Sequence, residues 1–368
     1  RRGGHELSVV TIRCDRIVSR AQHNTNQRHQ REDKRLAKFR NYPPEHGLRV
    51  PAAYLEKIVN DMLLSVEMDE ESAELIAGLL VANDARSVYS HGTKKLTEYL
   101  GQIRAGVVNP RPQVQIERDH GAAAVIDGDG GLGHVACFRG MTMAIAKAKE
   151  FGVGSVTTYN HYHFGSAGKW SRMALEHDCI GMATSSHRFH PNPEGMVTSA
   201  AGSSPISYAI PADKQPPLVL DMGGNMVSAS DHNMEHTPGA VFKGLGIGTV
   251  IVSLGGILAG IYRPEVQHPV SRWESNQGSH LTAWDVAHFA DVDYFKAEMD
   301  RYIGEARATK PLPGMERAEL AGGMEWAWEK DSKELGIIVS DEHREYLEEH
   351  ANECGVSTSF IDFEDTRF

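Results

Sequence analysis

Residues 122–133, Ala-Ala-Ala-Val-Ile-Asp-Gly-Asp-Gly-Gly-Leu-Gly, decide which kind of α/β fold this chain adopts. An apolar run typical of a buried strand is followed by glycines and then by the helical pattern of residues 133–151. A Rossmann dinucleotide fingerprint requires this placement, and also an acidic residue about 20 positions on, at the end of the next strand. That strand ends in Thr157-Thr158-Tyr159-Asn160, without an acid. We therefore interpret the glycines as a turn that starts a helix, with a Rossmann loop as the alternative.

The rest of the chain alternates between helical and strand patterns. Apolar residues at helical spacing predict helices that begin at Pro51, at Asp69 and at Thr93. Further helices are expected at residues 167–177, 292–308 and 341–354, and strands at residues 122–127, 155–159, 180–184, 206–212 and 218–222. A Pro-rich turn at residues 213–217 favours antiparallel pairing of the last two strands. Residues 263–279 are expected to form a loop.

The net charge of −11 is unevenly distributed along the chain. Residues 1–48 carry eleven Lys and Arg against five Asp and Glu and have little apolar periodicity, which predicts a disordered basic tail. Residues 49–368 carry 27 Lys and Arg against 44 Asp and Glu. This acidic balance argues against a nucleic-acid partner.

Two features bear on the compartment. The longest apolar run, residues 245–262, has nearly the length of a membrane span. Five glycines, with Thr249 and Ser253, favour a buried core helix instead, so we expect a soluble protein without a membrane partner. Widely spaced cysteines without a CxxC pair indicate reduced thiols and an intracellular, cytoplasmic location. They are Cys14, Cys137, Cys179 and Cys354.

Residues 88–96, Val-Tyr-Ser-His-Gly-Thr-Lys-Lys-Leu, lie between two predicted helices and carry the first candidate catalytic group. An imidazole titrates at about pH 6.5, so His91 can donate a proton to a developing alkoxide and take it back. Lys95 lies about one turn further on, near enough to hold a small anionic substrate beside it. The alternative interpretation is a surface loop followed by a solvated basic turn.

A second candidate group is a pair of histidines. His161 and His163 flank Tyr162 at the end of a predicted strand and are expected to point to one face. Such a pair begins some zinc sites, for which His187, His190, His232 and His236 are further candidate ligands. Without an HExxH motif or a spaced Cys/His set, we predict no metal site and keep a metal-dependent hydrolase as an alternative.

Seven short motifs, in this order, resemble the type-2 malate/L-lactate dehydrogenase family, which includes ureidoglycolate dehydrogenase, diketogulonate reductase and sulfolactate dehydrogenase. No single motif is specific; the ordered set is. The motifs are Tyr89-Ser90-His91-Gly92, Asp127-Gly128-Asp129 with Gly131 and Gly133, residues 160–165, Leu220-Asp221-Met222, Lys243-Gly244, Asn276-Gln277-Gly278 and Pro313-Gly314-Met315-Glu316-Arg317.

The resemblance implies reversible, NAD- or NADP-dependent hydride transfer between a small 2-hydroxy acid and its 2-oxo acid, carried out by a homodimer. It implies an α/β fold that is not a Rossmann fold, with a predominantly antiparallel cofactor-binding sheet, flanking helices and a helical domain from both chain ends. We expect helices of the substrate domain at residues 49–118, the cofactor-binding domain at 119–284 and C-terminal helices at 285–368. A non-catalytic, metabolite-binding descendant of the family is the second alternative.

The same resemblance implies roles for individual residues. His91 or His163 exchanges the proton, Ser90 belongs to the same catalytic motif, and Lys95 holds the carboxylate of the substrate. Cofactor contacts are expected from Pro217, Leu218, Val219, Leu220, Asp221, Met222, Gly223, Phe242, Lys243, Gly323, Met324 and Glu325. Further substrate contacts are expected from His187, Ser203 and Ser204.

The chain departs from the family pattern in three places. Lys95 replaces an arginine, which exchanges a bidentate fork for a point charge. Gly202-Ser203-Ser204-Pro205 replaces Gly-Thr-Asn-Pro, and a serine of the preceding strand end falls at Ser186 or His187. The interval from Asp221 to Lys243 is markedly shorter than in the family, which removes a segment that helps to cover the cofactor.

Overall fold

A short ribbon joins the two ends of the described chain, which comprises residues 42–224 and 226–368 of the computed structural model. β1 (Leu48–Val50) pairs antiparallel with β9 (Ile337–Val339). The sequence analysis did not predict this ribbon, because three residues are too few to show a period-2 pattern. Most of the expected tail, residues 1–48, lies outside the described residues, and β1 begins at its last position.

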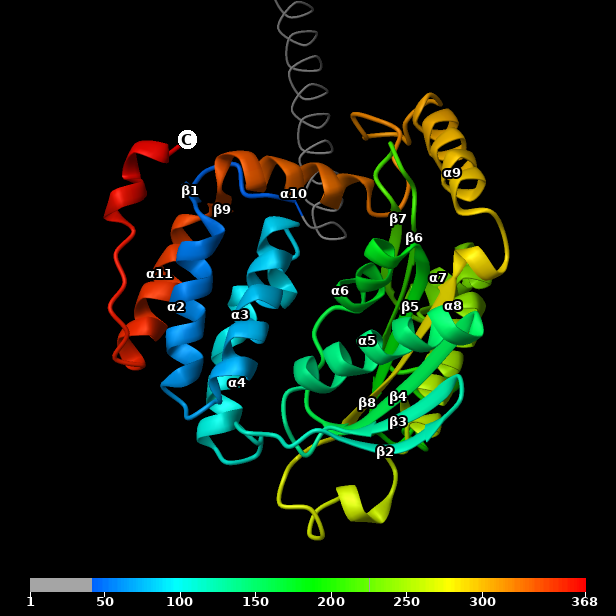
Figure 1. The fold of residues 1–368 in the computed structure, drawn as a ribbon, viewed down its shortest axis with the longest axis horizontal. Coiled ribbons are helices and arrows are strands. Elements are labelled where there is room, and N and C mark those ends of the chain that lie inside the picture. Colours follow the sequence, from blue (N-terminus) through cyan, green and yellow to red (C-terminus); the bar gives the residue numbers. More distant parts are fainter. Residues whose placement is uncertain (1–41, 225) are drawn as a thin grey trace, which may run out of the picture. The chain divides into compact units, whose positions relative to one another are not determined.

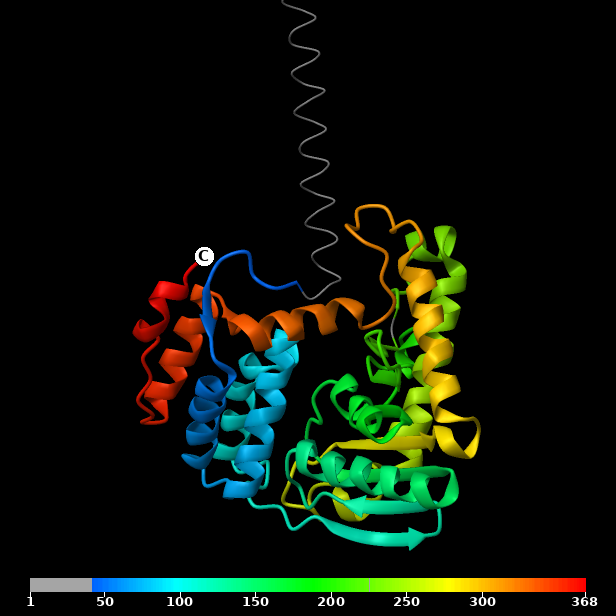
Figure 2. The ribbon, with the colours of Figure 1, turned by 45° about the horizontal axis from the view of Figure 1, so that its top comes forward.

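Helices from both chain ends share one apolar core with this ribbon (Figures 1 and 2). They are α2 (Ala52–Leu64), α3 (Glu70–Ala85), α4 (Leu96–Arg104) and α11 (Asp341–Glu353). As predicted, Asp69 caps α3, because its carboxylate accepts a hydrogen bond from the Ser72 N–H. A further helix, α10 (Gly323–Leu335), packs on α3 and leads toward the sheet.

The second part of the molecule is a seven-stranded sheet in the order β2-β3-β4-β8-β5-β6-β7. Every neighbouring pair is antiparallel except β3 and β4, which confirms the prediction of a predominantly antiparallel sheet in a mixed α/β fold. The strands are β2 (Gln115–His120), β3 (Ala123–Asp127), β4 (Val153–His161), β5 (Cys179–His187), β6 (Pro205–Ile210), β7 (Leu218–Gly223) and β8 (Gln277–Asp285).

Two of these strands were not predicted. β8 pairs with β4 on one side and β5 on the other, and begins inside the expected loop of residues 263–279, so that expectation was wrong at its end. Its buried side chains include Ser279, His280 and Thr282, which conceal its central position from a hydropathy pattern. β2 is exposed along its whole length and therefore has no apolar alternation to detect.

Helices cover both faces of the sheet, and glycines set how closely they approach. α5 (Gly133–Phe151) packs on the face that carries Leu281, which lies 2.8 Å from the position of a Cβ on Gly140. α8 (Pro238–Val252) continues as the π-helix η5 (Ser253–Leu258) on the face that carries Gly278, because side chains alternate along β8. Further helices are α6 (Gly168–Ser171), η3 (Arg172–His177), α7 (Asp231–His236) and α9 (Val292–Arg307).

The apolar run that was expected to be a buried core helix is only partly buried. By length and composition, residues 238–258 could cross a membrane, and 39% of their most apolar window is buried. Gly255 contacts the backbone of Ser185, whereas Phe242, Ile257 and Leu258 are each about 60% exposed. The glycines pack one side of the helix onto the sheet and leave an apolar outer side, so the expectation of a buried core helix holds for one side only.

The described cysteines are free thiols, as predicted. Cys137 and Cys179 are buried, and Cys354 is partly exposed. Burial raises the pKa of the Cys137 thiol to about 11, so it stays protonated at neutral pH. Cys14 lies outside the described residues.

Replacing Gly133 by Ala should destabilise the fold. A Cβ at this position would lie 2.8 Å from the Tyr162 carbonyl oxygen and 2.9 Å from the Phe164 Cα, and backbone atoms move less readily than side chains. Overpacking of this kind costs roughly 1–3 kcal/mol. Gly78→Ala is the control, because nothing lies within 4 Å of its Cβ position in α3 and alanine favours a helix. Urea unfolding should show a loss of stability only for Gly133→Ala; equal midpoints for the two variants would contradict the packing argument.

Candidate active site

Two short 3-10 turns, η1 (Tyr89–His91) and η2 (Thr93–Lys95), connect α3 to α4 and carry the first predicted catalytic residues. Asp84 at the end of α3 anchors them: its buried carboxylate accepts hydrogen bonds from the Thr93 hydroxyl at 2.5 Å and from the Thr93 N–H at 3.2 Å. A Cβ on Gly92 would fall within 2 Å of that carboxylate, so a glycine is required there. His91 therefore sits on a tightly held connection.

His91 and His163 lie together although 72 positions separate them in the sequence. Their ring centroids are 5.7 Å apart. Burial, reinforced by neighbouring positive charges, lowers the pKa of His91 to about 4 and that of His163 to about 3. Both imidazoles are therefore neutral at pH 7, and both keep partial access to solvent.

Tyr99 orients His163. Its hydroxyl lies 2.7 Å from the Nδ1 of His163, and burial raises the pKa of the phenol well above its usual value. The protonated hydroxyl can donate to Nδ1, which leaves the imidazole proton on Nε2 and aims it away from Tyr99. His91 is held in a similar way, with its Nδ1 3.0 Å from the Ser90 hydroxyl. Ser90 was predicted as a site residue from the sequence. Tyr99 was not, because its spacing in the helical pattern is that of a core residue.

His161 behaves differently from His163. It is fully buried as the last residue of β4, with its Nε2 2.8 Å from the Thr158 hydroxyl and its Nδ1 2.7 Å from the Tyr162 carbonyl oxygen. Asn160 has a positive φ of 55° and the strand pairing shifts here, so strand alternation does not extend to His163. Strand β4 ends at His161, so the alternation on which the expectation of one shared face was based does not reach His163.

Lys95 does not stand alone beside the histidines. It forms an ion pair with Glu98 in the first turn of α4, and Glu98 also accepts a hydrogen bond from the Tyr162 hydroxyl at 3.2 Å. A substrate carboxylate at Lys95 would compete with Glu98 for the same ammonium. The sequence analysis missed this carboxylate, although its i, i+3 spacing from Lys95 is a recognisable signal.

A buried lysine lies behind the histidine pair. The amine of Lys169 is 3.1 Å from the Nε2 of His134, and both side chains are buried. Burial, together with the nearby charge of Arg86, lowers the pKa of Lys169 to about 7. When protonated, this amine opposes a second positive charge on His91 or His163. Neither residue was predicted, because a lysine normally indicates a solvated face.

The predicted cofactor residues come together from two distant segments. β7 contains Leu218–Gly223, and α10 begins at Gly323. The Val219 N–H donates to the Ala321 carbonyl at 3.0 Å, and the Trp326 indole N–H donates to the Pro217 carbonyl at 2.8 Å. The chain from Pro217 to Val219, at the start of β7, therefore lies beside the start of α10, which carries Gly323, Met324 and Glu325, and the strand continues through Leu220, Asp221, Met222 and Gly223.

Asp221 is an exposed residue of β7 in this region. Its side chain keeps access to solvent, yet desolvation by the surrounding protein raises its pKa to about 6. The carboxylate accepts a hydrogen bond from the Gly168 N–H at 2.8 Å, which ties β7 to the start of α6. An acidic group that is accessible but desolvated is typical of the floor of a binding cleft.

Phe242 and Lys243 are exposed in the first turns of α8. This helix approaches the end of β7, because a Cβ on Gly224 would lie 3.0 Å from the Cα of Gly248. Ser204 is placed at the same end: its carbonyl accepts from the Gly224 N–H at 2.8 Å, and its hydroxyl donates to Ser186 at 3.2 Å.

The other two predicted substrate residues are less closely tied to this region. Ser203 is exposed, and His187 packs against Phe189 at a ring distance of 5.3 Å. Among the described residues, no hydrogen bond or ring contact joins Ser203, Ser204 or His187 to the pair of His91 and His163.

The backbone N–H groups of the glycine-rich turn after β3 are hydrogen-bonded within the protein. The N–H groups of Gly128, Gly130 and Gly133 donate to the carbonyls of Tyr159, Asn160 and His163 at 2.9, 2.8 and 3.2 Å. A pyrophosphate could use these donors only by breaking the turn.

The chemistry around β7 and α10 suits a dinucleotide. The side chain of Arg172 is 9% exposed, and its Nη1 has no hydrogen-bond partner among the described residues, since the nearest acidic oxygen, on Glu329, is 4.0 Å away. Asp221 and Glu325 are near enough to act on its charge. No side chain caps the N-terminus of α10. An orphaned guanidinium N–H and an uncapped helix start both fit the pyrophosphate of a nicotinamide cofactor.

The histidines were also candidate ligands of a metal ion. Within residues 42–224 and 226–368, no group of three or more His, Cys, Asp or Glu side chains is arranged to hold an ion. His232 and His236 stack on each other in α7 with ring centroids 4.3 Å apart.

Comparison with known proteins assigns the family. The family model described as malate/L-lactate dehydrogenase matches residues 50–239 and 224–348, and the overlap of the two matches lies within the shortened interval from Asp221 to Lys243. Malate dehydrogenase from Pyrococcus horikoshii is 30% identical over 86% of this chain and 98% of that protein. Its solved structure superimposes with a TM-score of 0.74, covering 87% of this chain and 99% of that one.

Other relatives carry different names within the same family. L-sulfolactate dehydrogenase from Methanocaldococcus jannaschii is 28% identical over 82% of this chain and 96% of that protein. Ureidoglycolate dehydrogenase (NAD(+)) from Escherichia coli K12 is 23% identical over 82% of this chain and 95% of that protein. The chain therefore belongs to the malate/L-lactate dehydrogenase family and is an oxidoreductase of the 2-hydroxyacid dehydrogenase kind.

The lowered histidine pKa values predict an acid-sensitive fold. An unfolded histidine binds a proton at about pH 6.5, whereas His91 does so only near pH 4 and His163 near pH 3. The unfolded state thus binds more protons below pH 6.5, and stability falls as the pH drops from there toward 4. Each histidine contributes up to about 1.4 kcal/mol per pH unit. Urea unfolding between pH 4.5 and 6.5 should give His163→Gln a shallower decline than the wild type; parallel declines would contradict the desolvated histidine.

Proposed function

We propose that this protein transfers hydride reversibly between a nicotinamide cofactor, NAD or NADP, and a small 2-hydroxy acid or 2-oxo acid. The observation that carries the proposal is the pair of neutral imidazoles, His91 and His163, in a partly accessible recess beside Lys95. The nicotinamide supplies or accepts the hydride, and a side chain must deliver or remove the accompanying proton. A neutral imidazole can take the hydroxyl proton of a 2-hydroxy acid as the hydride leaves, and the imidazolium so formed can return that proton to the oxygen of the 2-oxo acid in the reverse direction.

His163 is the proton donor in this proposal. The Tyr99 hydroxyl can both donate and accept, so it stabilises either tautomer of His163 and lets the same imidazole work in both directions. His91 lines the other side of the recess with Nδ1 held by Ser90. Because desolvation and the charge of Lys169 both oppose protonation, His91 and His163 are neutral in the empty site and can accept the hydroxyl proton of the substrate.

Lys95 binds the carboxylate of the substrate, with Glu98 as its partner when the site is empty. A lysine ammonium is a point charge on a flexible stem and fixes a carboxylate less firmly than an arginine fork does. His187, Ser203 and Ser204 complete the substrate contacts from the ends of β5 and β6, where Ser204 meets the end of β7.

The cofactor binds along β7 and the start of α10, without a Rossmann loop. The paired amides of Gly128, Gly130 and Gly133 support this assignment, as do the orphaned N–H of Arg172 and the uncapped α10. Phe242 and Lys243 on α8 approach from the far end of β7. The functional division is a helical part at residues 49–118, a cofactor domain at 119–284 and C-terminal helices at 285–368.

The working unit is a cytoplasmic homodimer, without a nucleic-acid or membrane partner. The apolar outer side of α8 and η5 supports the dimer, since Phe242, Val250, Ile257 and Leu258 are exposed along it. The acidic balance of residues 49–368 supports the absence of a nucleic-acid partner.

Steady-state kinetics test the function. Purified wild type should reduce at least one small 2-oxo acid with NADH or NADPH. His163→Ala should lower kcat by roughly 10²–10⁴, the usual contribution of a positioned acid or base. His120→Ala in exposed β2 is the matched control and should leave the constants unchanged. If no 2-oxo acid is turned over and neither nucleotide raises the melting temperature, the proposal fails.

Two substitutions at Lys95 and Glu98 should move KM in opposite directions. Lys95→Ala removes one charge-assisted bond to the substrate, about 1.5–3 kcal/mol, and should raise KM with little change in cofactor affinity. Glu98→Gln removes the competing carboxylate and should lower KM. A fall in KM for Lys95→Ala, or no change in either variant, would remove Lys95 from the substrate site.

A further inference from the structure

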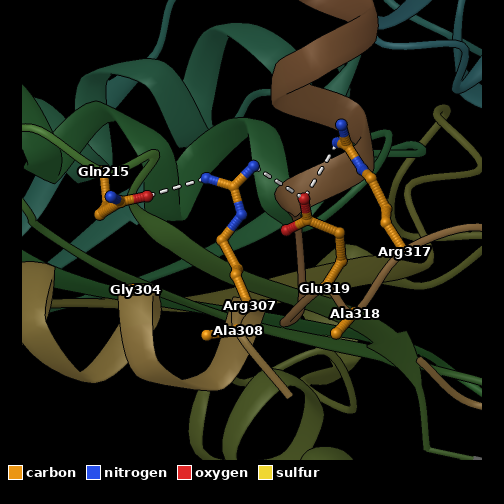
Figure 3. A pocket seen from close by; sticks show the side chains of 7 residues that line it. All are labelled: Gln215, Gly304, Arg307, Ala308, Arg317, Ala318 and Glu319. Carbon is orange, nitrogen blue, oxygen red and sulfur yellow. Dashed lines mark hydrogen bonds and ion pairs between the residues drawn. The ribbon is translucent and has the colours of Figure 1, made fainter. Parts of the chain in front are cut away.

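A hollow of about 390 Å³ lies beside the proposed cofactor strand and is lined by two arginines (Figure 3). Arg307 comes from the end of α9, Arg317 from the segment before α10, and Gln215 from the turn between β6 and β7. Glu319 lies between the two arginines. Three distant segments thus contribute polar groups to one place.

The arginines are held in position, and each keeps N–H donors that could bind a ligand. Both reach the same oxygen, the Oε1 of Glu319: Arg307 through Nη2 at 3.1 Å and Arg317 through Nη2 at 3.0 Å. Arg307 also donates to the Gln215 Oε1 at 2.8 Å. A guanidinium has five N–H donors, so further donors remain on both groups within the described structure. Two positive charges against one negative charge leave the hollow positive.

The walls of the hollow are fixed by α9. Asp300 of α9 accepts hydrogen bonds from the backbone N–H groups of Asp213, Lys214 and Gln215, at 2.9–3.1 Å. This clamp holds the turn that carries Gln215 against the helix that carries Arg307. The Glu319 side chain is only 8% exposed, so the ion pairs lie at the base of the hollow.

The hollow adjoins one end of the proposed cofactor site. Glu319 also lines a small neighbouring space with Pro217, Leu218 and Gly323, which are proposed cofactor residues. Asp221, near Lys169 and the histidines, lies three residues along β7 from Leu218, or about 10 Å at ~3.3 Å per residue. The arginines are therefore on the side of the cofactor strand remote from the histidines, where the adenosine end of a dinucleotide would lie if its nicotinamide reached them.

We propose that Arg307 and Arg317 bind a phosphate monoester, the 2′-phosphate on the adenosine ribose of the cofactor, so that the enzyme prefers NADP to NAD. The inference rests on the proposed function. A phosphate presents several acceptor oxygens and matches the planar forks of two arginines, which a ribose hydroxyl cannot do. Glu319 keeps the guanidinium groups in place when no phosphate is bound.

Cofactor titrations test the preference directly. NADPH and NADH binding to the full chain is measured by nucleotide fluorescence. The wild type should bind NADPH about tenfold or more tightly than NADH, as expected for the loss of charge-assisted bonds. Arg317→Gln should weaken NADPH by a similar factor and leave NADH unchanged. Arg301→Gln on α9 is the matched control, because Arg301 is exposed and its recorded pairs are Glu298 and Glu305.

Thermal shift with fragments gives a second readout without turnover. Adenosine 2′,5′-bisphosphate should raise the melting temperature of the wild type more than 5′-AMP or inorganic phosphate does, and Arg317→Gln should abolish the difference. If Arg317→Gln does not fold, Arg317→Lys keeps the pair with Glu319 and loses the fork, so it should reduce the preference for NADPH.

The outcomes separate the inference from the function on which it rests. Equal affinities for NADPH and NADH in the wild type, or an equal loss of both in Arg317→Gln, would overturn the inference and leave the dehydrogenase function standing. Inorganic phosphate that binds as well as the bisphosphate would overturn the assignment to the cofactor. Failure of both nucleotides to bind would contradict the proposed function and the inference together.

Discussion

Asp84 holds the connection between α3 and α4 through its hydrogen bonds to Thr93, and the position of His91 depends on that anchor. Burial raises the pKa of the Asp84 carboxyl to about 7, because the ionised carboxylate is poorly solvated at this position. The bonds from Thr93 offset part of that cost. The Thr93 hydroxyl also lies 2.7 Å from the Nε2 of His343 in α11, so the C-terminal helix buttresses the same connection.

Desolvation sets the chemistry of the histidine pair. It is the main reason that His91 and His163 are neutral, and the charges of Lys169 and Lys95 add to its effect. An imidazole that is neutral at pH 7 and held by Tyr99 can accept the hydroxyl proton in the oxidative direction and return it in the reductive one. The same groups make the native state sensitive to acid, so the features that suit the site to proton transfer also limit its stability at low pH.

The strand β7 connects the two ends of the proposed cofactor site. Its Asp221 is tied to α6 beside Lys169, and its other end is tied to α10 through Val219 and Trp326. Because α10 also packs on α3, the helical part and the sheet meet at this strand. A ligand along β7 would therefore contact residues from both parts, which explains why the candidate residues are scattered from His91 to Glu325.

The sequence alone determined the amphipathic helices and most strands, because turn residues and the spacing of apolar side chains are local. Its ordered motifs also indicated the family, and the mostly antiparallel sheet was expected from that resemblance. Only the tertiary structure placed His163 against His91 and Tyr99, and buried Lys169 beside His134. It also revealed β8 as a central strand and gathered Arg307, Arg317 and Glu319 around one hollow. These features depend on contacts between residues far apart in the chain and on desolvation, and neither leaves a periodic signal in the sequence.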